Sequence, residues 1–500
     1  METSLSGLAK RLDDFLFELG SLHYRYGAGL SSELPVAQLY QRYRELAQPD
    51  TFRQVRQTVE DERTDERVRA RLSLLLEFLA GQVEDALAAP AMEQIATLEA
   101  TAQVPTAEGV LPFREATAQL AHEPQRERRA HLEKGLGDLL WENQGPYARR
   151  REAATRTAEV LGYPSYLTLR DGVTGFSAEK LAAACTGVLS ETEDAFRDLL
   201  TYVLKKVDPS LKPAQARRHD LQYASTAPWM AQHFRREDLL PSVTRCLSEM
   251  GLKPNADGRI LFDTEDRPGK TSRAFVADLR VPDEIRLVAR PLGGLGDYFA
   301  LLHELGHAQQ RAHVLRTAPV EERRLGDLSV TEGFAYLFDH LLLDEGWHKR
   351  FLRLPPTVAR EAARLAAFNN LWLLRRYAAK LPYELSLYER GPERPLAEEY
   401  EERLGAALFV GVHKGFFLYD VDAQLYATRY LRAWALEARL HAVLCDRFNE
   451  DFWRNPATGA WLQSLFSRGQ RDSAEVMAEQ LGAPLSLSEA GSRLVQVMGA

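Results

Sequence analysis

Apolar residues recur along most of this chain at the spacing of an amphipathic helix. Leu8, Leu12, Phe15 and Leu16 form the first such stripe, and a second covers residues 68–78. Residues three and four positions apart share one face of a helix, so each stripe predicts a helix with a buried apolar face. The same pattern returns after each interruption. We therefore expect a mainly α protein.

Prolines and turn residues interrupt the helical pattern at a few places. The polar, proline-containing stretch 101–112 predicts a break, and Pro355, Pro356 and Pro382 predict helix ends further on, because proline cannot donate to the helix hydrogen bonds. A chain of 500 residues is about two to three times the usual domain length. We expect an N-terminal helical lobe of residues 1–250, with a sub-boundary near 101–112, and a second lobe of residues 251–500.

A period of two, which indicates a β-strand, occurs at one place. Residues 273–281 and 284–290 alternate apolar and other side chains, and Pro282-Asp283 between them is typical of a tight turn. We therefore expect one small hairpin in a chain that is otherwise helical.

The net charge disfavours some classes of binding partner, and the cysteine content indicates the cell compartment. The net charge of −8 disfavours nucleic acid and anionic membranes as partners. Cys185, Cys246 and Cys445 are odd in number and far apart, which favours a reducing compartment. We find neither a signal segment nor a run of about 18 apolar residues. We expect a cytoplasmic protein, a monomer or a homodimer, that binds neither nucleic acid nor membranes.

The segment His303-Glu304-Leu305-Gly306-His307 carries the strongest chemical signal. It has the H-E-x-x-H pattern within a helical stretch, and residues i and i+4 lie on one face of a helix. Two imidazoles placed in this way can bind one zinc ion at about 2.0–2.1 Å. The pattern predicts His303 and His307 as metal ligands and Glu304 as the base that takes a proton from a metal-bound water.

The residues around the motif agree with this interpretation. Leu301, Leu302 and Leu305 form an apolar face that packs the helix, so the histidines are left to line a cavity. Asp297 is the predicted N-cap. Gly306 costs about 1 kcal/mol relative to alanine, and the close approach of a substrate or of a neighbouring helix would explain it. The alternative is a pair of partly buried histidines bonded to carbonyl groups.

Glu332, near the start of the next helix, is the predicted third ligand, because zinc peptidases with a glutamate ligand carry it there. The alternative is a capping box formed by Ser329 and Glu332. Asp339 is either a hydrogen-bond partner of a ligand histidine or a solvent-facing residue. His313 and His340 lack ligand spacing, and we interpret both as structural.

Two histidines and one glutamate leave a fourth position for water, as in catalytic zinc sites. Zinc lowers the pKa of that water toward about 7, and Glu304 takes the proton. The hydroxide then attacks a peptide carbonyl, and Glu304 passes the proton to the leaving amine. The sequence predicts a zinc-dependent peptidase with one Zn²⁺ per chain, and the lobe of residues 251–500 is the catalytic lobe.

These residues resemble the thimet oligopeptidase and oligoendopeptidase F family of zinc metallopeptidases, a gluzincin family. The resemblance is specific over roughly residues 270–440. It is carried by the predicted hairpin and by three motifs, Asp297-x5-His303-Glu304-Leu305-Gly306-His307-Ala308, Ser329-x-x-Glu332-Gly333-Phe334-Ala335 and Asp422-Ala423-Gln424-Leu425-Tyr426-Ala427-Thr428-Arg429-Tyr430.

The resemblance implies an elongated, two-lobed helical protein with a deep central channel and zinc on the channel floor. Such a channel admits short unstructured oligopeptides and excludes folded proteins. The expected partners are therefore peptide substrates.

The resemblance also implies a histidine and one or two tyrosines that hydrogen-bond the substrate and the oxyanion. Tyr426 is the first candidate, followed by Tyr430 and His413, and then by Tyr419. The family spacing is altered: one alignment places Leu425 where a tyrosine is expected, and the other places Tyr426 there. From spacing alone, the three tyrosines share one face of one helix. Packing into the core is the alternative role for each.

Two other functions fit the same residues. One is a metallocarboxypeptidase with the same zinc chemistry, and the other is a weakly active or inactive zinc-containing protein that binds peptides. In a peptidase of either kind, oligopeptidase or carboxypeptidase, the strand at 284–290 is expected to lie at the edge of its sheet. Its free edge is then a candidate to pair with an extended substrate.

Overall fold

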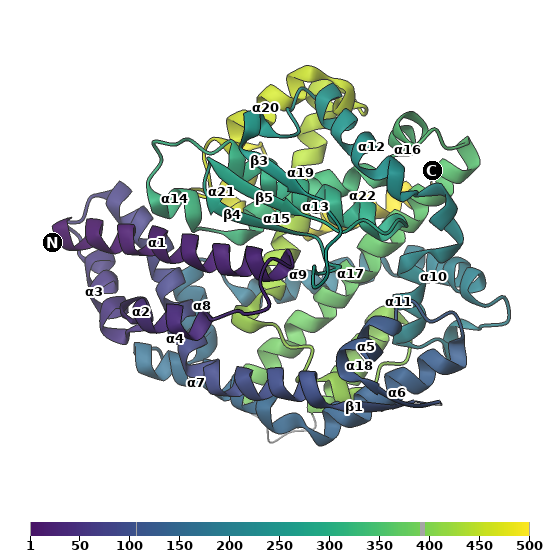
Figure 1. Ribbon diagram of the computed structural model, residues 1–500, viewed down its shortest axis with the longest axis horizontal. Coiled ribbons are helices and arrows are strands. Elements are labelled where there is room, and N and C mark those ends of the chain that lie inside the picture. Colours follow the sequence, from purple (N-terminus) through teal and green to yellow (C-terminus); the bar gives the residue numbers. More distant parts are fainter. Residues whose placement is uncertain (1, 107, 391–395, 500) are drawn as a thin grey trace. The chain divides into compact units, whose positions relative to one another are not determined.

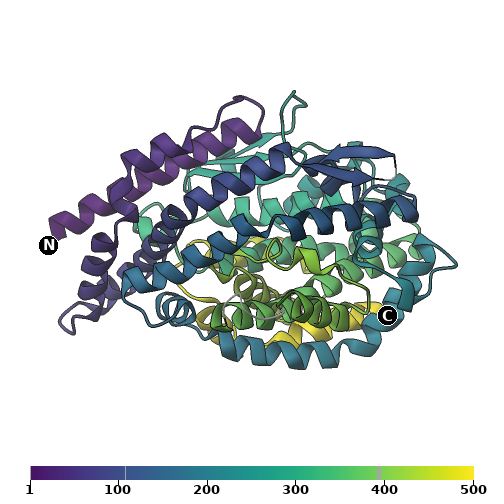
Figure 2. The same ribbon diagram turned by 90° about the horizontal axis from the view of Figure 1, so that it is seen from below.

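Long helices build most of the structure, as the apolar periodicity predicts, so the mainly α prediction is confirmed (Figure 1). The computed structural model describes residues 2–106, 108–390 and 396–499. The chain begins with α1 (Glu2–Gly27), purple in Figure 1 and in the perpendicular view of Figure 2. No helix of the described residues is long and apolar enough to cross a membrane.

The chain forms two compact units, and each is assembled from separate segments. Unit 1 comprises Met1–Ala80, Met230–Ala363 and Arg432–Ser486, and unit 2 comprises Gly81–Trp229, Arg364–Leu431 and Leu487–Ala500. These units differ from the predicted lobes 1–250 and 251–500. Three boundaries fall inside the long helices α4 (Glu66–Thr101), α17 (Pro356–Arg390) and α19 (Ala427–Phe448), and one falls inside the 3₁₀ turn η3 (Pro228–His233). A single cut in the sequence cannot describe the units, because the segments that pack together are far apart along the chain.

Unit 1 holds one small sheet among its helices. Its complete helices are α1, α2 (Val36–Arg42), α3 (Pro49–Glu60), α12 (Arg236–Glu249), α13 (Leu295–Ala312), α14 (Val320–Arg324), α15 (Leu328–Asp339), α16 (Glu345–Phe351), α20 (Pro456–Phe466) and α21 (Ala474–Gln480). Its 3₁₀ turns are η1 (Arg44–Ala47), η4 (Ala256–Gly258), η5 (His340–Leu343) and η8 (Phe452–Arg454).

Unit 2 holds a second set of helices and a two-stranded hairpin. Its complete helices are α5 (Phe113–Gln119), α6 (Arg126–Glu142), α7 (Gln144–Leu161), α8 (Tyr166–Thr174), α9 (Ala178–Glu191), α10 (Glu193–Val207), α11 (Arg218–Thr226), α18 (Leu396–Leu408) and α22 (Leu487–Gly499). Its 3₁₀ turns are η2 (Pro213–Gln215), η6 (Lys414–Phe416) and η7 (Ala423–Leu425).

The predicted hairpin exists in unit 1 as part of a larger sheet. Strands β4 (Phe275–Arg280) and β5 (Glu284–Val288) pair antiparallel, and β3 (Ile260–Asp263) pairs parallel to β5, which gives the order β3-β5-β4. The prediction that the strand at 284–290 offers a free edge is therefore wrong, because β5 is hydrogen-bonded on both sides.

Two local expectations differ from the structure. The stretch 101–112 contains a second hairpin, β1 (Gln103–Thr106) with β2 (Gly109–Pro112), and not a simple break. Its four-residue strands contain prolines and lack a clear period of two. Pro382 lies inside α17 and does not end it. Leu381 and Tyr383, which flank this proline, are fully buried, so packing offsets the roughly 3 kcal/mol that a proline costs within a helix.

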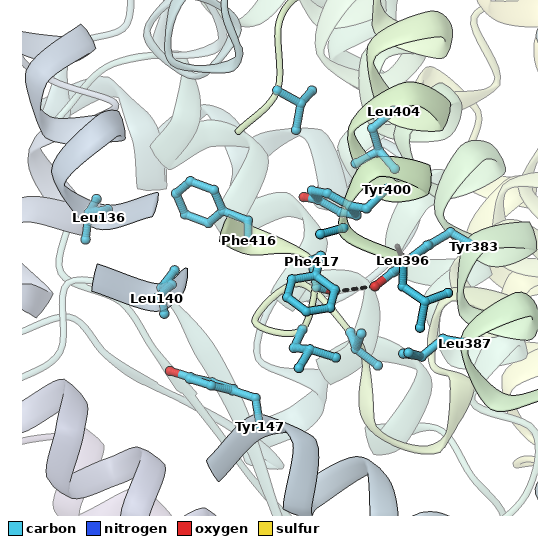
Figure 3. Packing of buried hydrophobic residues seen from close by; sticks show 14 of the residues in the cluster. Leu136, Leu140, Tyr147, Tyr383, Leu387, Leu396, Tyr400, Leu404, Phe416 and Phe417 are labelled. Atoms are coloured by element: carbon cyan, nitrogen blue, oxygen red, sulfur yellow. Dashed lines mark hydrogen bonds between the residues drawn. The ribbon is translucent and has the colours of Figure 1, made fainter. Parts of the chain in front are cut away.

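The core of unit 2 contains a hydrophobic cluster, to which α6, α7, α17, α18 and the segment after α18 contribute many residues. Leu136, Leu140, Tyr383, Phe416 and Phe417 all belong to it (Figure 3). The hydroxyl of Tyr383 donates to the carbonyl of Phe417 at 2.7 Å. This bond satisfies a polar group that is otherwise costly to bury.

Candidate metal centre

Helix α13 of unit 1 carries the H-E-x-x-H residues. Leu301, Leu302 and Leu305 are at most 1% exposed, so the apolar face packs the helix as predicted. The N-cap is Gly294 and not Asp297. Asp297 lies in the first turn, and its carboxylate accepts the backbone N–H groups of the preceding loop at 2.5 and 2.7 Å. Asp297 therefore holds the loop before α13 in place from the first turn of the helix and not from the N-cap position.

A glycine allows α13 to approach α15. A Cβ atom on Gly306 would lie 2.6 Å from Cα of Ala335 and 2.8 Å from the carbonyl oxygen of Phe334. Of the two explanations offered by the sequence, the close approach of a neighbouring helix is the correct one. This approach places the histidines of α13 beside Glu332 of α15.

His303, His307 and Glu332 converge on one point. The Nε2 atoms of the two histidines lie 3.3 and 3.7 Å from the same Glu332 oxygen, Oε2. Candidate ligand atoms of the three residues lie within 4.8 Å of one another, and this is the one such group found among the described residues. The three side chains come from two helices that the sequence separates, so the structure brings together the whole predicted set of ligands.

The Nδ1 atom of each histidine lies within hydrogen-bond distance of a side chain of α15. His303 Nδ1 lies 2.8 Å from Asp339 Oδ2, and His307 Nδ1 lies 2.8 Å from Thr331 Oγ1. With Nδ1–H donating to an oxygen, Nε2 keeps its lone pair. Both rings therefore present a ligand atom toward Glu332. Asp339 takes the first of its two predicted roles, and the sequence did not identify Thr331.

The capping-box alternative for Glu332 is wrong. The N-cap of α15 is Asp327, whose carboxylate accepts the N–H of Ser329 at 2.9 Å. Glu332 lies a full turn inside the helix and is 7% exposed. Its carboxylate is therefore directed to the histidines and does not cap the helix.

The donor set fits a tetrahedral zinc ion. Ligand atoms held at about 2.0–2.2 Å with tetrahedral angles lie roughly 3.3–3.6 Å apart, and the observed Nε2–Oε2 separations are 3.3 and 3.7 Å. Two imidazoles and one carboxylate are also the donors that zinc accepts with one position left open.

The electrostatics of the two histidines differ. Burial lowers the pKa of His307 to about 4, so this ring is neutral and can be a ligand. Burial also lowers the pKa of His303, but hydrogen bonds to Asp339 and Glu332 outweigh burial and raise it to about 10. A metal ion at His303 Nε2 would displace the proton that this pKa implies there, and the same carboxylates would stabilise the charge of the ion.

Glu304 lies in the same half-buried region. Burial and the nearby Glu332 carboxylate raise the pKa of Glu304 to about 7, against the opposing effects of His303, Arg273 and a hydrogen bond from the backbone of Val276. A carboxyl group with this pKa can both accept and donate a proton near neutral pH. The contact from Val276 comes from β4, and no residue type in the sequence indicates a backbone donor.

The predicted tyrosines and His413 lie in unit 2. Tyr426 and Tyr430 meet edge to face at 4.9 Å, and Tyr430 contacts Tyr377 at 5.0 Å. His413 instead faces α6, where its Nε2 lies 3.4 Å from Asp138 Oδ1. The prediction of one shared helix is wrong, since only Tyr430 lies within α19. Their catalytic roles stay predictions.

The two histidines that the sequence analysis interpreted as structural, His313 and His340, have local partners, and so does Tyr419. His313 Nδ1 lies 2.8 Å from the carbonyl of Gln309, and His340 Nδ1 lies 2.8 Å from Glu437 Oε2. Tyr419 packs against the rings of Phe113, Tyr147 and Phe416 at 5.9–6.1 Å. Tyr419 is thus part of the aromatic packing of unit 2, as in the alternative considered for it.

Comparison with known proteins rests on the fold. No family model matches the chain, and no curated protein matches its sequence. A protein of Bacillus anthracis str. Ames assigned as an oligoendopeptidase F matches 97% of this chain and 88% of its own, with a TM-score of 0.64 and 14% identity. A PZ peptidase A solved with an inhibitor matches 92% of this chain and 87% of its own, with a TM-score of 0.64 and 13% identity. The chain therefore shares the mainly helical fold of these two proteins, which confirms that part of the prediction, and the deep central channel stays a prediction.

Proposed function

We propose that this protein is a zinc-dependent peptidase that hydrolyses peptide bonds of short unstructured oligopeptides. The observation that carries the proposal is the convergence of both Nε2 atoms of His303 and His307 on one oxygen of Glu332, with Glu304 in the same region. The fold shared with two proteins named as peptidases supports it.

His303, His307 and Glu332 would hold the ion, while Asp339 and Thr331 orient the two rings. When bound, Zn²⁺ supplies the Lewis acidity that polarises a peptide carbonyl and makes water a nucleophile near neutral pH. Glu304 takes the proton of the attacking water and delivers it to the leaving amide nitrogen. Burial raises the pKa of Glu304, which favours proton uptake by a carboxyl group that must change protonation state twice in each cycle.

The test combines metal analysis with an unbiased substrate search. The purified full-length chain is expected to contain about one zinc per molecule, because one group of three ligands is present in the described residues. Digestion of a mixed peptide library, read by mass spectrometry, should yield fragments, and a chelator should abolish them. A chain that binds zinc and peptides without cleaving would contradict the peptidase proposal and favour the peptide-binding alternative.

The same library distinguishes the two enzyme classes. Peptides with an amidated C-terminus lack the free carboxylate that a carboxypeptidase must recognise. Continued internal cleavage of these peptides supports an oligopeptidase. Loss of all cleavage when the C-terminus is amidated would support the metallocarboxypeptidase instead.

A further inference from the structure

A buried series of polar contacts leads from His303 to α19 within unit 1. Asp339 Oδ2 lies 2.8 Å from His303 Nδ1, and Asp339 Oδ1 lies 3.7 Å from His340 Nε2. His340 Nδ1 in turn lies 2.8 Å from Glu437 Oε2. Asp339, His340 and Glu437 are 5%, 2% and 1% exposed. Burying three ionisable groups is costly, so their presence behind a ligand histidine calls for a role beyond packing.

Aromatic rings support the same series of residues. Tyr336 stacks on His340 with a centroid distance of 5.7 Å and an interplanar angle of 17°, and on Trp434 at 4.8 Å and 13°. Tyr336 also meets His303 edge to face at 5.5 Å. The ring of His303 is therefore contacted both by the carboxylate of Asp339 and by Tyr336.

A second glycine brings α15 close to α19. A Cβ atom on Gly333 would lie 3.0 Å from Cδ2 of Leu436 and 3.4 Å from the carbonyl oxygen of Ala433. Trp434 and Glu437 stand three positions apart on α19, so they share one helix face. Through Trp434 and Glu437, this face of α19 contacts Tyr336 and His340, which lie behind His303.

We propose that Glu437 and His340 are positioning residues for the metal centre. Glu437 orients the ring of His340 through the 2.8 Å contact with its Nδ1 atom. The ring of His340 stands 3.7 Å from Asp339 Oδ1, so it limits the rotation of this carboxylate by packing and charge and not by a hydrogen bond. Asp339 can then accept the Nδ1–H of His303 in a single orientation and leave Nε2 directed at the ion. The inference rests on the proposed function, in that His303, His307 and Glu332 must hold a metal ion.

The test measures Zn²⁺ affinity of the full chain by competition with a chromophoric chelator. Glu437→Gln keeps the size of the side chain and removes its charge. It should weaken zinc binding by up to about 10-fold, and by less than Asp339→Asn, because about 10- to 100-fold is the usual effect of changing the direct partner of a ligand histidine. The matched control is Glu321→Gln. Glu321 is also a buried glutamate of unit 1, 3% exposed, but it pairs with Arg71 at 3.1 Å, so its change should leave zinc affinity within about twofold.

A second background separates positioning from simple stabilisation. If Glu437 acts through Asp339, then Glu437→Gln should cause little further loss of zinc affinity in a chain that already carries Asp339→Asn, because coupled residues are not additive. An equal loss in both backgrounds would overturn the inference. So would an equal loss in the Glu321→Gln control.

The outcomes also separate this inference from the proposed function. A wild-type chain that binds no zinc overturns both. A wild-type chain that binds zinc, with Glu437→Gln binding equally tightly, overturns only the positioning role. Should Glu437→Gln fail to fold, His340→Gln is compared with His348→Gln. His348 is a fully buried histidine of unit 1 that bonds the carbonyl of Leu342 at 2.8 Å, so only the change at His340 should weaken zinc binding.

Discussion

Gly306 of α13 lies so close to Ala335 of α15 that a Cβ atom on the glycine would stand 2.6 Å from the alanine Cα. The two helices are therefore in backbone contact one turn from where Glu332 meets His303 and His307. The distance between the ligands depends on this contact, because His303 and His307 belong to one helix and Glu332 to the other.

Replacing Gly306 with alanine should push the helices apart. Overpacking costs about 1–3 kcal/mol and the helix propensity of alanine offsets about 1 kcal/mol of this cost. We therefore expect urea denaturation to show a net loss of up to about 2 kcal/mol in unfolding free energy, together with weaker zinc binding. Gly296→Ala is the control, since Gly296 lies in the same helix and nothing stands within 4 Å of its Cβ position. Unchanged zinc affinity in Gly306→Ala would show that the helix contact does not set the ligand geometry.

Glu304→Gln should separate metal binding from turnover. The amide keeps the shape of the side chain but cannot take a proton, so kcat should fall by about 10²–10⁴-fold while the zinc content stays at the wild-type level. Peptide hydrolysis and metal analysis on the same preparation measure both. Turnover at the parent rate would exclude Glu304 as the base. Glu321→Gln serves as the control for a buried glutamate outside the site.

Thr331→Val should weaken zinc binding without unfolding the chain. Valine has nearly the shape of threonine but lacks the hydroxyl that lies 2.8 Å from His307 Nδ1. Losing this partner should lower zinc affinity about tenfold or more. Thr331→Ser restores a hydroxyl and should recover most of the affinity. If the Thr331→Val and Thr331→Ser variants bind zinc with equal affinity, the hydroxyl of Thr331 does not orient the ring of His307.

Tyrosine-to-phenylalanine variants test the predicted oxyanion partner. If the hydroxyl of Tyr426 donates to the oxyanion, Tyr426→Phe should lower kcat by about 10²–10³-fold with little change in KM or in zinc content. Tyr430→Phe and the replacement of His413 with alanine test the next candidates. Tyr419→Phe is the control, because the Tyr419 ring packs among Phe113, Tyr147 and Phe416. A normal kcat for Tyr426→Phe would remove the first candidate.

Asp420 should give unit 2 a defined dependence of stability on pH. Burial raises its pKa, but Arg376, Lys380 and Arg218 outweigh burial and hold the pKa at about 2, below the usual value of 3.8. Because the folded pKa is lowered, its contribution is fully present above about pH 4 and is lost as pH falls toward 2. At about 1.4 kcal/mol per pKa unit, the contribution is about 2–3 kcal/mol.

The difference in unfolding free energy between wild type and Asp420→Asn measures this contribution. It should be constant from pH 7 to 5 and shrink between about pH 4 and 2. Asp50→Asn is the control, since the Asp50 side chain is 82% exposed in its pair with Arg53 and exposed pairs contribute little. If the difference in unfolding free energy between wild type and Asp420→Asn does not change below pH 4, the lowered pKa of Asp420 is contradicted.

The sequence predicted the two histidine ligands because they depend on local geometry: His303 and His307 share a face through the helical repeat alone. Glu332 was predicted instead from the place where zinc peptidases with a glutamate ligand carry it, and α14 lies between its helix and α13. Helix content followed from apolar periodicity, which is local as well. Asp339 was correctly named as a partner of a ligand histidine, with an alternative that only the structure could exclude.

The errors concern contacts between residues far apart in the chain. The position of β5 at the centre of the sheet depends on its pairing with β3, which no alternation within 284–290 encodes. Asp327 is the N-cap instead of Ser329, because α15 begins two residues earlier than the capping pattern predicts. Tyr419 does not share a helix with Tyr430, because α18 ends at Leu408 and α19 begins only at Ala427, with the 3₁₀ turns η6 and η7 between them.

The sequence by itself determined that α13 presents two imidazoles and a carboxylate on neighbouring positions, because backbone geometry within one helix is local. Only the tertiary structure decided how these groups are used. Gly306 sets the approach of Glu332, Thr331 and Asp339 orient the rings, and a backbone group of β4 contacts Glu304. The physical reason is that these distances are set by the packing of separate elements, and packing depends on the simultaneous fit of side chains that no local pattern specifies.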